Sequence, residues 1–230
     1  LKDFGFRIDN RNYEVFTIHP RKPLPAHSIQ YIVEGDWSNA AFLLIAGAIA
    51  GEVTLKGADL NSAQGDKNIM EALYDCGAEV NIHQKDITVK KNNLKAFEFD
   101  ATHCPDLFPP LVALAGCCKG TTTIKGVNRL LHKESNRAIA LRDEFKKMNV
   151  EVELNGDLMT IHGGKEVKGA KVSSHNDHRI AMATAVAGLA AKGQTIIHDA
   201  EAVNKSYPDF YKDLKSIKKN AGDSKKKDVI

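Results

Sequence analysis

The sequence has little cysteine, no long apolar run and almost no excess of charge, and each shortage excludes a class of protein. Its 4 cysteines form no Cys-x-x-Cys pair and two of them are adjacent, so neither a zinc site nor a disulfide framework is predicted. The longest apolar run, Ala40–Ala50, is too short to span a bilayer. A net charge of +3 is too small to indicate nucleic-acid binding. We therefore expect a protein of a reducing compartment with no membrane or nucleic-acid partner.

Enough apolar residues remain to form a core. The 230 residues are 43% hydrophobic and 27% charged, which excludes disorder over most of the chain and allows one large domain or two small ones. The chain begins with Leu1 rather than Met, and Leu1–Phe6 resembles the last turn of a helix closed by glycine. Arg7–Asp9 and Tyr13–Ile18 alternate apolar and polar residues, which predicts a hairpin with its turn at residues 10–12. A helix end with no helix before it indicates a piece of a longer protein.

A pattern of about 70 residues occurs three times and decides the predicted fold. In each copy a short strand is followed by an aspartate, an apolar segment rich in small residues, a glycine and a second strand; the aspartates are Asp36, Asp106 and Asp177. The segments are apolar all round, which is typical of helices buried among others. The predicted first strands are residues 29–33, 96–99 and 171–173, the apolar helices are 40–50, 107–118 and 180–191, and the second strands end at Gly57, Gly126 and Asp199.

Each copy continues with an amphipathic helix, expected on the surface, and the first two copies close with a hairpin. The unit is therefore strand, helix, strand, helix, strand, strand, and the third copy lacks its hairpin. From Asn220 onward the lysine-rich sequence predicts a solvated tail, with a nucleic-acid or membrane contact as the alternative. The predicted amphipathic helices are residues 65–76, 134–148 and 207–217, and the predicted hairpins pair 79–82 with 86–89 and 150–154 with 158–161.

Charged residues gather at the predicted helix starts of the second and third copies. Free backbone N–H groups and the helix dipole favour anions there. Because these starts are equivalent ends of repeated elements, we expect their side chains to converge on one cleft. Cations together with carboxylates suit a substrate that carries phosphate and carboxylate groups. The candidate residues are Asp106, Lys133, Glu134, Arg137, Asp177, His178, Arg179 and Lys205.

Each candidate has a plainer interpretation when it is taken alone. The aspartates are typical helix N-caps, and the Lys-Glu pair with the following arginine fits an exposed first turn. The histidine and the last lysine fit ordinary helix-start and solvent positions. As a repeat-equivalent set, however, they favour a functional site. By contrast, Cys117 and Cys118 lie in an apolar helix and Trp37 lies at a strand-to-helix corner, so all three are predicted to pack in the core.

Six blocks of the sequence occur in the order and spacing of one enzyme family. The blocks are VEGDWSNAAFLLIAGAI, SAQGD, CPDLFPPLVALA, HKESNR, NDHRIAMA and NKSYPDF. Over residues 1–217 the chain resembles the 5-enolpyruvylshikimate-3-phosphate synthases, also called 3-phosphoshikimate 1-carboxyvinyltransferases. The resemblance implies an α/β fold of repeated βαβαββ units, the inside-out α/β barrel of enolpyruvyl transferases, in two domains that close over the substrates.

The resemblance also implies where this chain lies within the two domains. Residues 1–82 would be the last unit of the N-terminal domain, residues 83–218 most of the C-terminal domain, and residues 219–230 a flexible tail. The family's N-terminal phosphate site, a further arginine for phosphoenolpyruvate and a Ser-Ser-Gln motif would all lie upstream of Leu1. We therefore expect a fragment that is inactive alone. The family is mostly monomeric, so a monomer is expected.

The resemblance assigns a role to each member of the charged set. Asp106 stands at the family's catalytic aspartate, which contacts the shikimate hydroxyls. The implied catalytic residues are Asp106, Glu134, His178 and Lys205; those for phosphoenolpyruvate are Arg137, Arg179 and Lys205; and those for shikimate 3-phosphate are Asn39, Asp106, Lys133 and Arg129 or the adjacent Asn128.

The implied reaction adds the 5-hydroxyl of shikimate 3-phosphate to phosphoenolpyruvate and then eliminates phosphate. The hydroxyl must lose a proton, which Asp106 would accept, and the methylene carbon must gain one from Glu134 or Lys205. Fixed cations would hold the charges of the phosphate and the carboxylate. No metal or redox cofactor is required.

Two positions depart from the family pattern, and two other functions stay open. Asn136 stands where the family usually has Asp, which removes a carboxylate near Glu134 and Arg137 and changes the local pKa balance. His132 stands where the family has a small or branched residue. The sister UDP-N-acetylglucosamine enolpyruvyl transferase shares the repeat fold but not the last three blocks together. An RNA-binding relative of the same repeat fold is the other alternative, against which the weak net charge argues.

Overall fold

The computed structural model describes residues 2–20, 30–131 and 133–219, and contacts divide the chain into unit 1, Leu1–Glu34, and unit 2, Gly35–Ile230. Unit 1 has a short 3-10 helix, η1 (Lys2–Phe4), and Gly5 follows it with a φ of 80°. The predicted hairpin is confirmed as β1 (Ile8–Arg11) paired antiparallel with β2 (Val15–Ile18). Its turn lies at residues 12–14, two residues later than predicted.

The strand predicted at residues 29–33 is wrong in the part that the structure describes. Gln30–Val33 form no strand, and Ile32 is 92% exposed. In the second repeat the equivalent strand lies beside its second strand, but in the first repeat that place beside β3 (Gly51–Leu55) is occupied by β12 (Lys218–Lys219). An alternating apolar pattern forms a strand only where a neighbouring strand supplies the ladder hydrogen bonds. Residue 29 lies outside the described residues.

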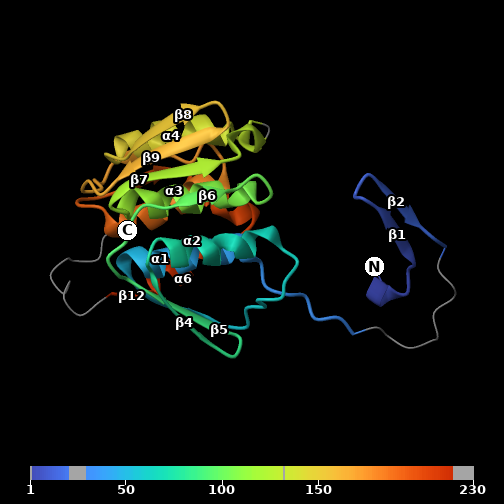
Figure 1. The fold of residues 1–230 in the computed structure, drawn as a ribbon. Coiled ribbons are helices and arrows are strands. Elements are labelled where there is room, and N and C mark those ends of the chain that lie inside the picture. The colour runs from blue at the N-terminus through green and yellow to red at the C-terminus, as the bar shows by residue number, and fades with distance from the viewer. Residues whose placement is uncertain (1, 21–29, 132, 220–230) are drawn as a thin grey trace. The chain divides into compact units, whose positions relative to one another are not determined.

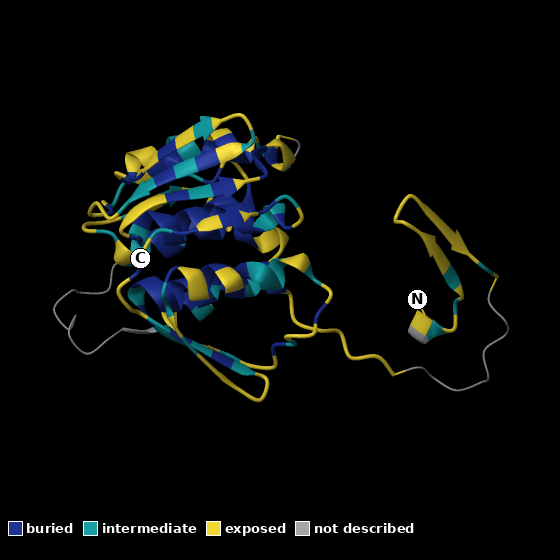
Figure 2. Ribbon diagram, in the orientation of Figure 1, coloured by how far each residue is buried: buried dark blue, intermediate teal, exposed yellow. Residues whose placement is uncertain are grey.

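Three inner helices form the core of unit 2. They are α1 (Trp37–Ala50), α3 (Phe108–Cys117) and α5 (His178–Ala190), and they pack against one another. Figure 2 shows the inner helices almost wholly buried. A glycine also lets α1 lie close to the neighbouring sheet, because a Cβ on Gly47 would lie 2.7 Å from the carbonyl oxygen of the strand residue Val89. The three predicted apolar helices are therefore confirmed, and the fold class follows from their repetition.

Each of the first two repeats carries a four-stranded sheet. The first sheet has the order β12-β3-β5-β4 and the second β6-β7-β9-β8, while β10 and β11 form a parallel pair. Figure 1 shows the hairpins β4–β5 and β8–β9 on opposite sides of the helices of unit 2. Both hairpins predicted for the repeats are confirmed, with strand ends within two residues of the predicted ones. The strands not yet given bounds are β4 (Glu79–His83), β5 (Asp86–Lys90), β6 (Glu98–Asp100), β7 (Gly120–Lys125), β8 (Glu151–Asn155), β9 (Leu158–Gly163), β10 (Lys171–Ser173) and β11 (Ile196–His198).

The amphipathic helices are shorter than predicted because 3-10 turns and caps occupy their starts. Asn136 caps α4, its side chain accepting from the backbone N–H of Ile139, so Lys133 and Glu134 precede the helix rather than open it. The helices are α2 (Ile69–Asp75), α4 (Arg137–Lys147) and α6 (Phe210–Lys215), and the 3-10 helices of unit 2 are η2 (Gly65–Asn68), η3 (Pro105–Leu107), η4 (Val127–Leu130) and η5 (Ala200–Lys205).

The predicted domain boundary between residues 82 and 83 falls inside the β4–β5 hairpin. The division between the two compact units lies instead between Glu34 and Gly35. How these units correspond to the two domains of the family stays a prediction. The tail predicted from Asn220 lies outside the described residues, whereas residues 218–219 form β12.

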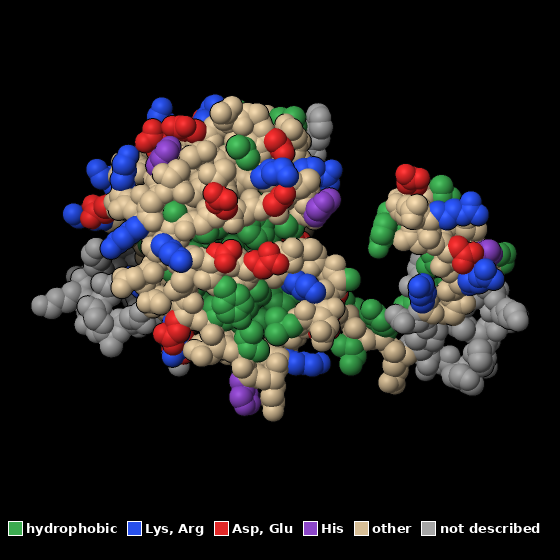
Figure 3. All heavy atoms as spheres, viewed as in Figure 1, with side chains coloured by type: hydrophobic (Ala, Val, Ile, Leu, Met, Phe, Trp, Pro, Cys, Tyr) green, Lys and Arg blue, Asp and Glu red, His purple; other side chains and the backbone are tan. Residues whose placement is uncertain are grey.

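On the face drawn in Figure 3, acidic and basic side chains of unit 2 are interspersed rather than separated by sign. None of the helices in the described part of the chain is long and apolar enough to cross a bilayer. The adjacent Cys117 and Cys118, predicted as core, are half-buried and buried, and all four cysteines are free thiols.

Candidate active site

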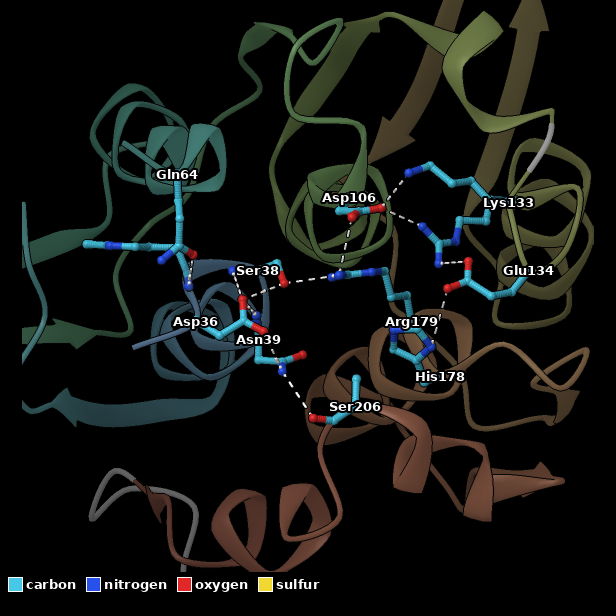
Figure 4. A network of polar contacts seen from close by, with 12 residues as sticks. Asp36, Ser38, Asn39, Gln64, Asp106, Lys133, Glu134, His178, Arg179 and Ser206 are labelled. Atoms are coloured by element: carbon cyan, nitrogen blue, oxygen red, sulfur yellow. Dashed lines mark hydrogen bonds and ion pairs between the residues drawn. The ribbon is translucent and has the colours of Figure 1, made fainter. Parts of the chain in front are cut away.

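The starts of the three inner helices lie together in unit 2, and polar side chains from all three meet there (Figure 4). Asp36 and Asp177 are the N-caps of α1 and α5; Asp36 accepts from the N–H of Ser38 at 2.8 Å and Asp177 from the N–H of Arg179 at 2.9 Å. The plainer N-cap interpretation is therefore correct for Asp177. It is wrong for Asp106, whose side chain makes no cap hydrogen bond and binds cations instead.

Arg137 is a buried cation that three carboxylates surround. Its side chain is 1% exposed, and its Nε lies 2.8 Å from Asp177, which is itself 0% exposed. Its Nη1 lies 2.7 Å from Asp106, and its Nη2 pairs with Glu134. Ser135 Oγ donates to the same Asp177 oxygen that Arg137 Nε binds, at 3.0 Å. Arg137 thus fixes the positions of the predicted catalytic residues Asp106 and Glu134.

Asp106 is the point at which three cations converge. Arg179 Nη2 lies 3.3 Å from Oδ2, and Lys133 Nζ lies 3.1 Å from Oδ1, the oxygen that Arg137 also binds. Burial alone would raise the pKa of Asp106, but the charges of Arg179, Arg137 and Lys133 outweigh it and hold the pKa below its ordinary value. Arg179 also donates to Ser38 Oγ at 3.0 Å, which joins α5 to α1. Asp106 is therefore a carboxylate at neutral pH.

His178 lies at the edge of this cluster, and one of its ring nitrogens is unpaired. Its Nδ1 is buried without a hydrogen-bond partner and lies 3.9 Å from Glu134. Burial lowers the pKa of His178 below 6.5, and the charge of Arg179 adds to the effect, against opposing contributions from Asp177 and Glu134. The imidazole is therefore neutral at pH 7, when it can donate and accept one hydrogen bond each.

An NMR titration of the His178 ring is expected to give a midpoint below 6.5, because burial disfavours the charged form. Glu134→Gln removes a carboxylate that favours the charged ring, so the midpoint in that variant should fall further. A midpoint above 6.5 in the wild-type chain would contradict the buried placement of this ring.

Asn39 and Lys205 reach the site from α1 and η5. Asn39 Nδ2 donates to Asp36 at 2.8 Å and to the carbonyl of Ser206 at 3.4 Å, while its Oδ1 is buried without a partner. Lys205 is exposed, and its Nζ donates to the carbonyl oxygen of Asn176 at 2.5 Å, next to Asp177. The structure thus brings both predicted residues to the helix starts.

The remaining predicted positions are less closely joined to the cluster. Arg129 and Asn128 lie on η4, and within the described residues neither side chain forms a hydrogen bond or ion pair with the cluster. Their role stays a prediction. Asn136, the departure from the family pattern, serves as the N-cap of α4. His132 lies outside the described residues.

Several polar residues of the site were missing from the predicted set. Gln64 accepts from the backbone N–H of Trp37 and donates to the carbonyl oxygen of Gly35, both at 2.9 Å, and so pins the start of α1. Trp37 itself is 2% exposed, which confirms its predicted packing role. Gln64 belongs to the SAQGD block that precedes the second helix of the first repeat, equivalent to the HKESNR block in the second. The equivalence of these two blocks is the sequence feature from which Gln64 could have been predicted as a site residue.

Asp66, in the same block, is a further residue that the predicted set did not include. Its Oδ1 is buried without a hydrogen-bond partner. Burial raises the pKa of Asp66, and the charges of Asp106 and Asp36 raise it further against the opposing charge of Arg179. Asp66 is therefore ionised less readily than an exposed aspartate.

Unsatisfied buried atoms show what the site can bind. They include the donor Arg179 Nη1, the acceptors Asn39 Oδ1 and Asp66 Oδ1, and the ring atom His178 Nδ1. Buried polar groups are ordinarily paired, so these atoms indicate a polar ligand. Arginine and lysine donors beside helix starts suit an anion, and the acceptors suit hydroxyl groups. In the described ranges no three His, Cys, Asp or Glu side chains are grouped to hold a metal ion.

Fold and site together define the class of enolpyruvyl-transferase-like proteins. The enolpyruvyl transferase NikO from Streptomyces tendae superposes with a TM-score of 0.73 at 18% identity over 95% of this chain and 51% of its own, which shows the shared fold. EPSP synthase from Acinetobacter baumannii superposes with a TM-score of 0.77 at 27% identity, over 94% of this chain and 52% of its own.

Within that class, the family is also shown. The family model described as EPSP synthase (3-phosphoshikimate 1-carboxyvinyltransferase) matches residues 1–214, and the chain belongs to this family. Proteins named 3-phosphoshikimate 1-carboxyvinyltransferase are 39% identical in Clostridium novyi, over 94% of this chain and 49% of that protein, and 42% identical in Methanocella arvoryzae, over 93% and 50%. The chain thus spans about half the length of these relatives, and the resemblance is confirmed.

Proposed function

We propose that the chain forms part of a 3-phosphoshikimate 1-carboxyvinyltransferase, which transfers the enolpyruvyl group of phosphoenolpyruvate to the 5-hydroxyl of shikimate 3-phosphate and releases phosphate. The observation that carries this proposal is the carboxylate of Asp106 held among three cations, beside buried donors and acceptors that have no partner. Such a site pairs a proton acceptor for a hydroxyl group with fixed positive charge for an anion.

The roles of the site residues follow from their positions. Asp106, an ionised carboxylate, accepts the proton of the 5-hydroxyl as the new C–O bond forms. Glu134, which is 42% exposed and lies within 3.9 Å of His178, gives a proton to the methylene carbon, with Lys205 as the alternative donor. As phosphate leaves, the new methyl group loses a proton back to the carboxylate of Glu134, so the proton given in the addition step is recovered. His178 lies beside Glu134 as a neutral imidazole.

The cations divide between the two anionic substrates. Arg179 has a free buried donor and takes the carboxylate or phosphate of phosphoenolpyruvate, with Lys205 beside it. Arg137 is enclosed by carboxylates, so its share in binding phosphoenolpyruvate is chiefly to fix the residues around it. The groups for shikimate 3-phosphate are Lys133, Asn39 and Arg129. We propose further that the protein acts as a monomer in the cytoplasm.

Calorimetric titration tests the proposed substrates. The 230-residue chain is expected to bind phosphoenolpyruvate and shikimate 3-phosphate but not UDP-N-acetylglucosamine, because the family model and the similar proteins are 3-phosphoshikimate 1-carboxyvinyltransferases. Its phosphate release should be undetectable, since the chain spans only half of its relatives. Preferential binding of UDP-N-acetylglucosamine would favour the sister transferase, steeply salt-dependent RNA binding would favour the RNA-binding alternative, and native-like turnover would show that this half suffices.

A further inference from the structure

The loop that precedes α5 has an unusual backbone. His175 and Asn176 are consecutive residues with φ values of 52° and 56°, in the left-handed region that residues with a Cβ seldom adopt. Asp177, His178 and Arg179 follow immediately, and all three belong to the site. A disfavoured conformation persists only where surrounding contacts fix it, and such conformations cluster at functional sites. The contacts that fix this loop therefore bear on the site.

Glu144 supplies the principal contacts, although it lies outside the set predicted from the sequence. Its side chain is 3% exposed. One carboxylate oxygen accepts from the backbone N–H of Ser173 at 2.9 Å, and the other lies 2.8 Å from Nε2 of His175. Lys147 Nζ, on the same helix, binds the Ser173-bound oxygen at 2.6 Å. One buried carboxylate thus holds the loop at two points on either side of Ser174.

Two residues of helix α4 bind the two ends of this segment. Arg137 and Glu144 are seven residues apart, or two helical turns, and so lie on one face of α4. Arg137 binds Asp177 at the end of the loop, and Glu144 binds its beginning and middle. Ser174 Oγ anchors the far side by donating to the carbonyl oxygen of Asp199 at 2.9 Å.

We propose that Glu144 is a positioning residue of the site: by holding Ser173 and His175 it fixes the left-handed turn that aims His178 and Arg179 at the ligand. Its importance for substrate binding rests on the proposed function, whereas its hold on the loop does not. Glu144 touches no reacting group and acts only through the loop. Burial opposes ionisation of Glu144, but bonds from Lys147, Ser173 and His175 keep its pKa below the ordinary value, so the carboxylate is charged when it binds the loop.

The test compares Glu144→Ala and Glu144→Gln with the wild-type chain, using inorganic phosphate as the probe. Glu144→Ala is expected to raise the Kd for phosphate by about tenfold, as for loss of a hydrogen bond to a charged group, and to speed hydrogen exchange at the amides of residues 175–179. Glu144→Gln keeps an oxygen for the Ser173 N–H but loses the charge that binds His175, so both effects should be intermediate. All measurements are made at a temperature well below the midpoint of thermal unfolding of each variant.

Arg142→Ala is the matched control, because Arg142 also forms an ion pair on α4, with Asp143, and within the described residues its side chain makes no hydrogen bond or ion pair with residues 173–177. It should change neither phosphate affinity nor exchange at residues 175–179. The proposal is overturned if Glu144→Ala lowers the midpoint temperature of thermal unfolding while its affinity for phosphate stays within about twofold of wild type. If the wild-type chain does not bind phosphate, the proposed anion site fails instead; unchanged exchange at residues 175–179 in Glu144→Ala would then still refute the positioning role.

Discussion

Arg137→Met is expected to lower the free energy of unfolding by about 3–5 kcal/mol at neutral pH, as is typical when one partner of a buried ion pair is removed. The variant leaves Asp177, which is 0% exposed, without its only ion pair to a Lys or Arg among the described residues. Asp106 keeps Lys133 and Arg179, so the loss falls mainly on Asp177. Equilibrium unfolding in urea, followed by circular dichroism, measures the change.

The loss of unfolding free energy in Arg137→Met should depend on pH in a defined direction. In the wild-type chain burial would raise the pKa of Asp177, but hydrogen bonds and charge from Arg137, with bonds from Arg179 and Ser135, hold it below its ordinary value. A lowered folded-state pKa contributes stability above the unfolded-state value of about 4, and this is lost as the pH falls through the folded-state pKa. Without Arg137, burial raises the pKa of Asp177. The deficit should therefore be largest at neutral pH and shrink on acidification.

Arg137→Lys serves as the control for charge alone. Lysine keeps a positive charge but cannot contact Asp177, Asp106 and Glu134 in one fork, so an intermediate loss is expected. If Arg137→Lys loses as much stability as Arg137→Met, the effect depends on the geometry of the guanidinium group and not on the positive charge alone. A loss below about 1 kcal/mol in Arg137→Met, the range of exposed ion pairs, would show that Arg137 is not enclosed as the structure places it.

The repeat and its inner helices could be predicted because their signals are local. Alanine-rich segments that are apolar all round have few alternatives to burial, and alternating residues on either side of a short polar turn define the hairpins. The strand predicted at residues 29–33 failed because its apolar residues have no strand to pair with in the described part of the chain, and the two-residue β12 that lies beside β3 has no apolar pattern at all. The local sequence of neither segment indicates which distant strand it pairs with.

The site was predicted where charge is conspicuous and missed where it is not. Asp106 and Arg179 border apolar helices, and Lys133 belongs to a charged block. Gln64 is an uncharged residue in a loop, and Glu144 resembles an ordinary exposed partner of Lys147 on an amphipathic helix. Burial distinguishes Glu144 from such a partner, and burial depends on β10 and the loop packing over α4, which the helix sequence does not reveal.

Arg179→Met should raise the Kd for phosphoenolpyruvate by about 10- to 100-fold, the range for loss of a hydrogen bond to a charged group. Arg179 has a buried donor, Nη1, with no partner, so its loss removes a ligand contact as well as the bonds of Nη2 to Asp106 and Ser38. Asp106 remains paired with Arg137 and Lys133, and stability should fall less than in Arg137→Met. Isothermal titration with phosphoenolpyruvate gives the affinity, and urea unfolding gives the stability.

Two comparisons separate binding by Arg179 from a general loss of charge. Arg179→Lys keeps the charge without the fork, so its affinity should lie between those of wild type and Arg179→Met. Ser38→Ala keeps Arg179 but removes the hydroxyl that orients Nη2, and should weaken binding less than either. If Arg179→Met binds phosphoenolpyruvate as tightly as wild type while Lys133→Met does not, the anion lies on the Lys133 side of Asp106. The unpaired Nη1 of Arg179 would then face water or another group, and the division of cations between the two substrates would have to be reversed.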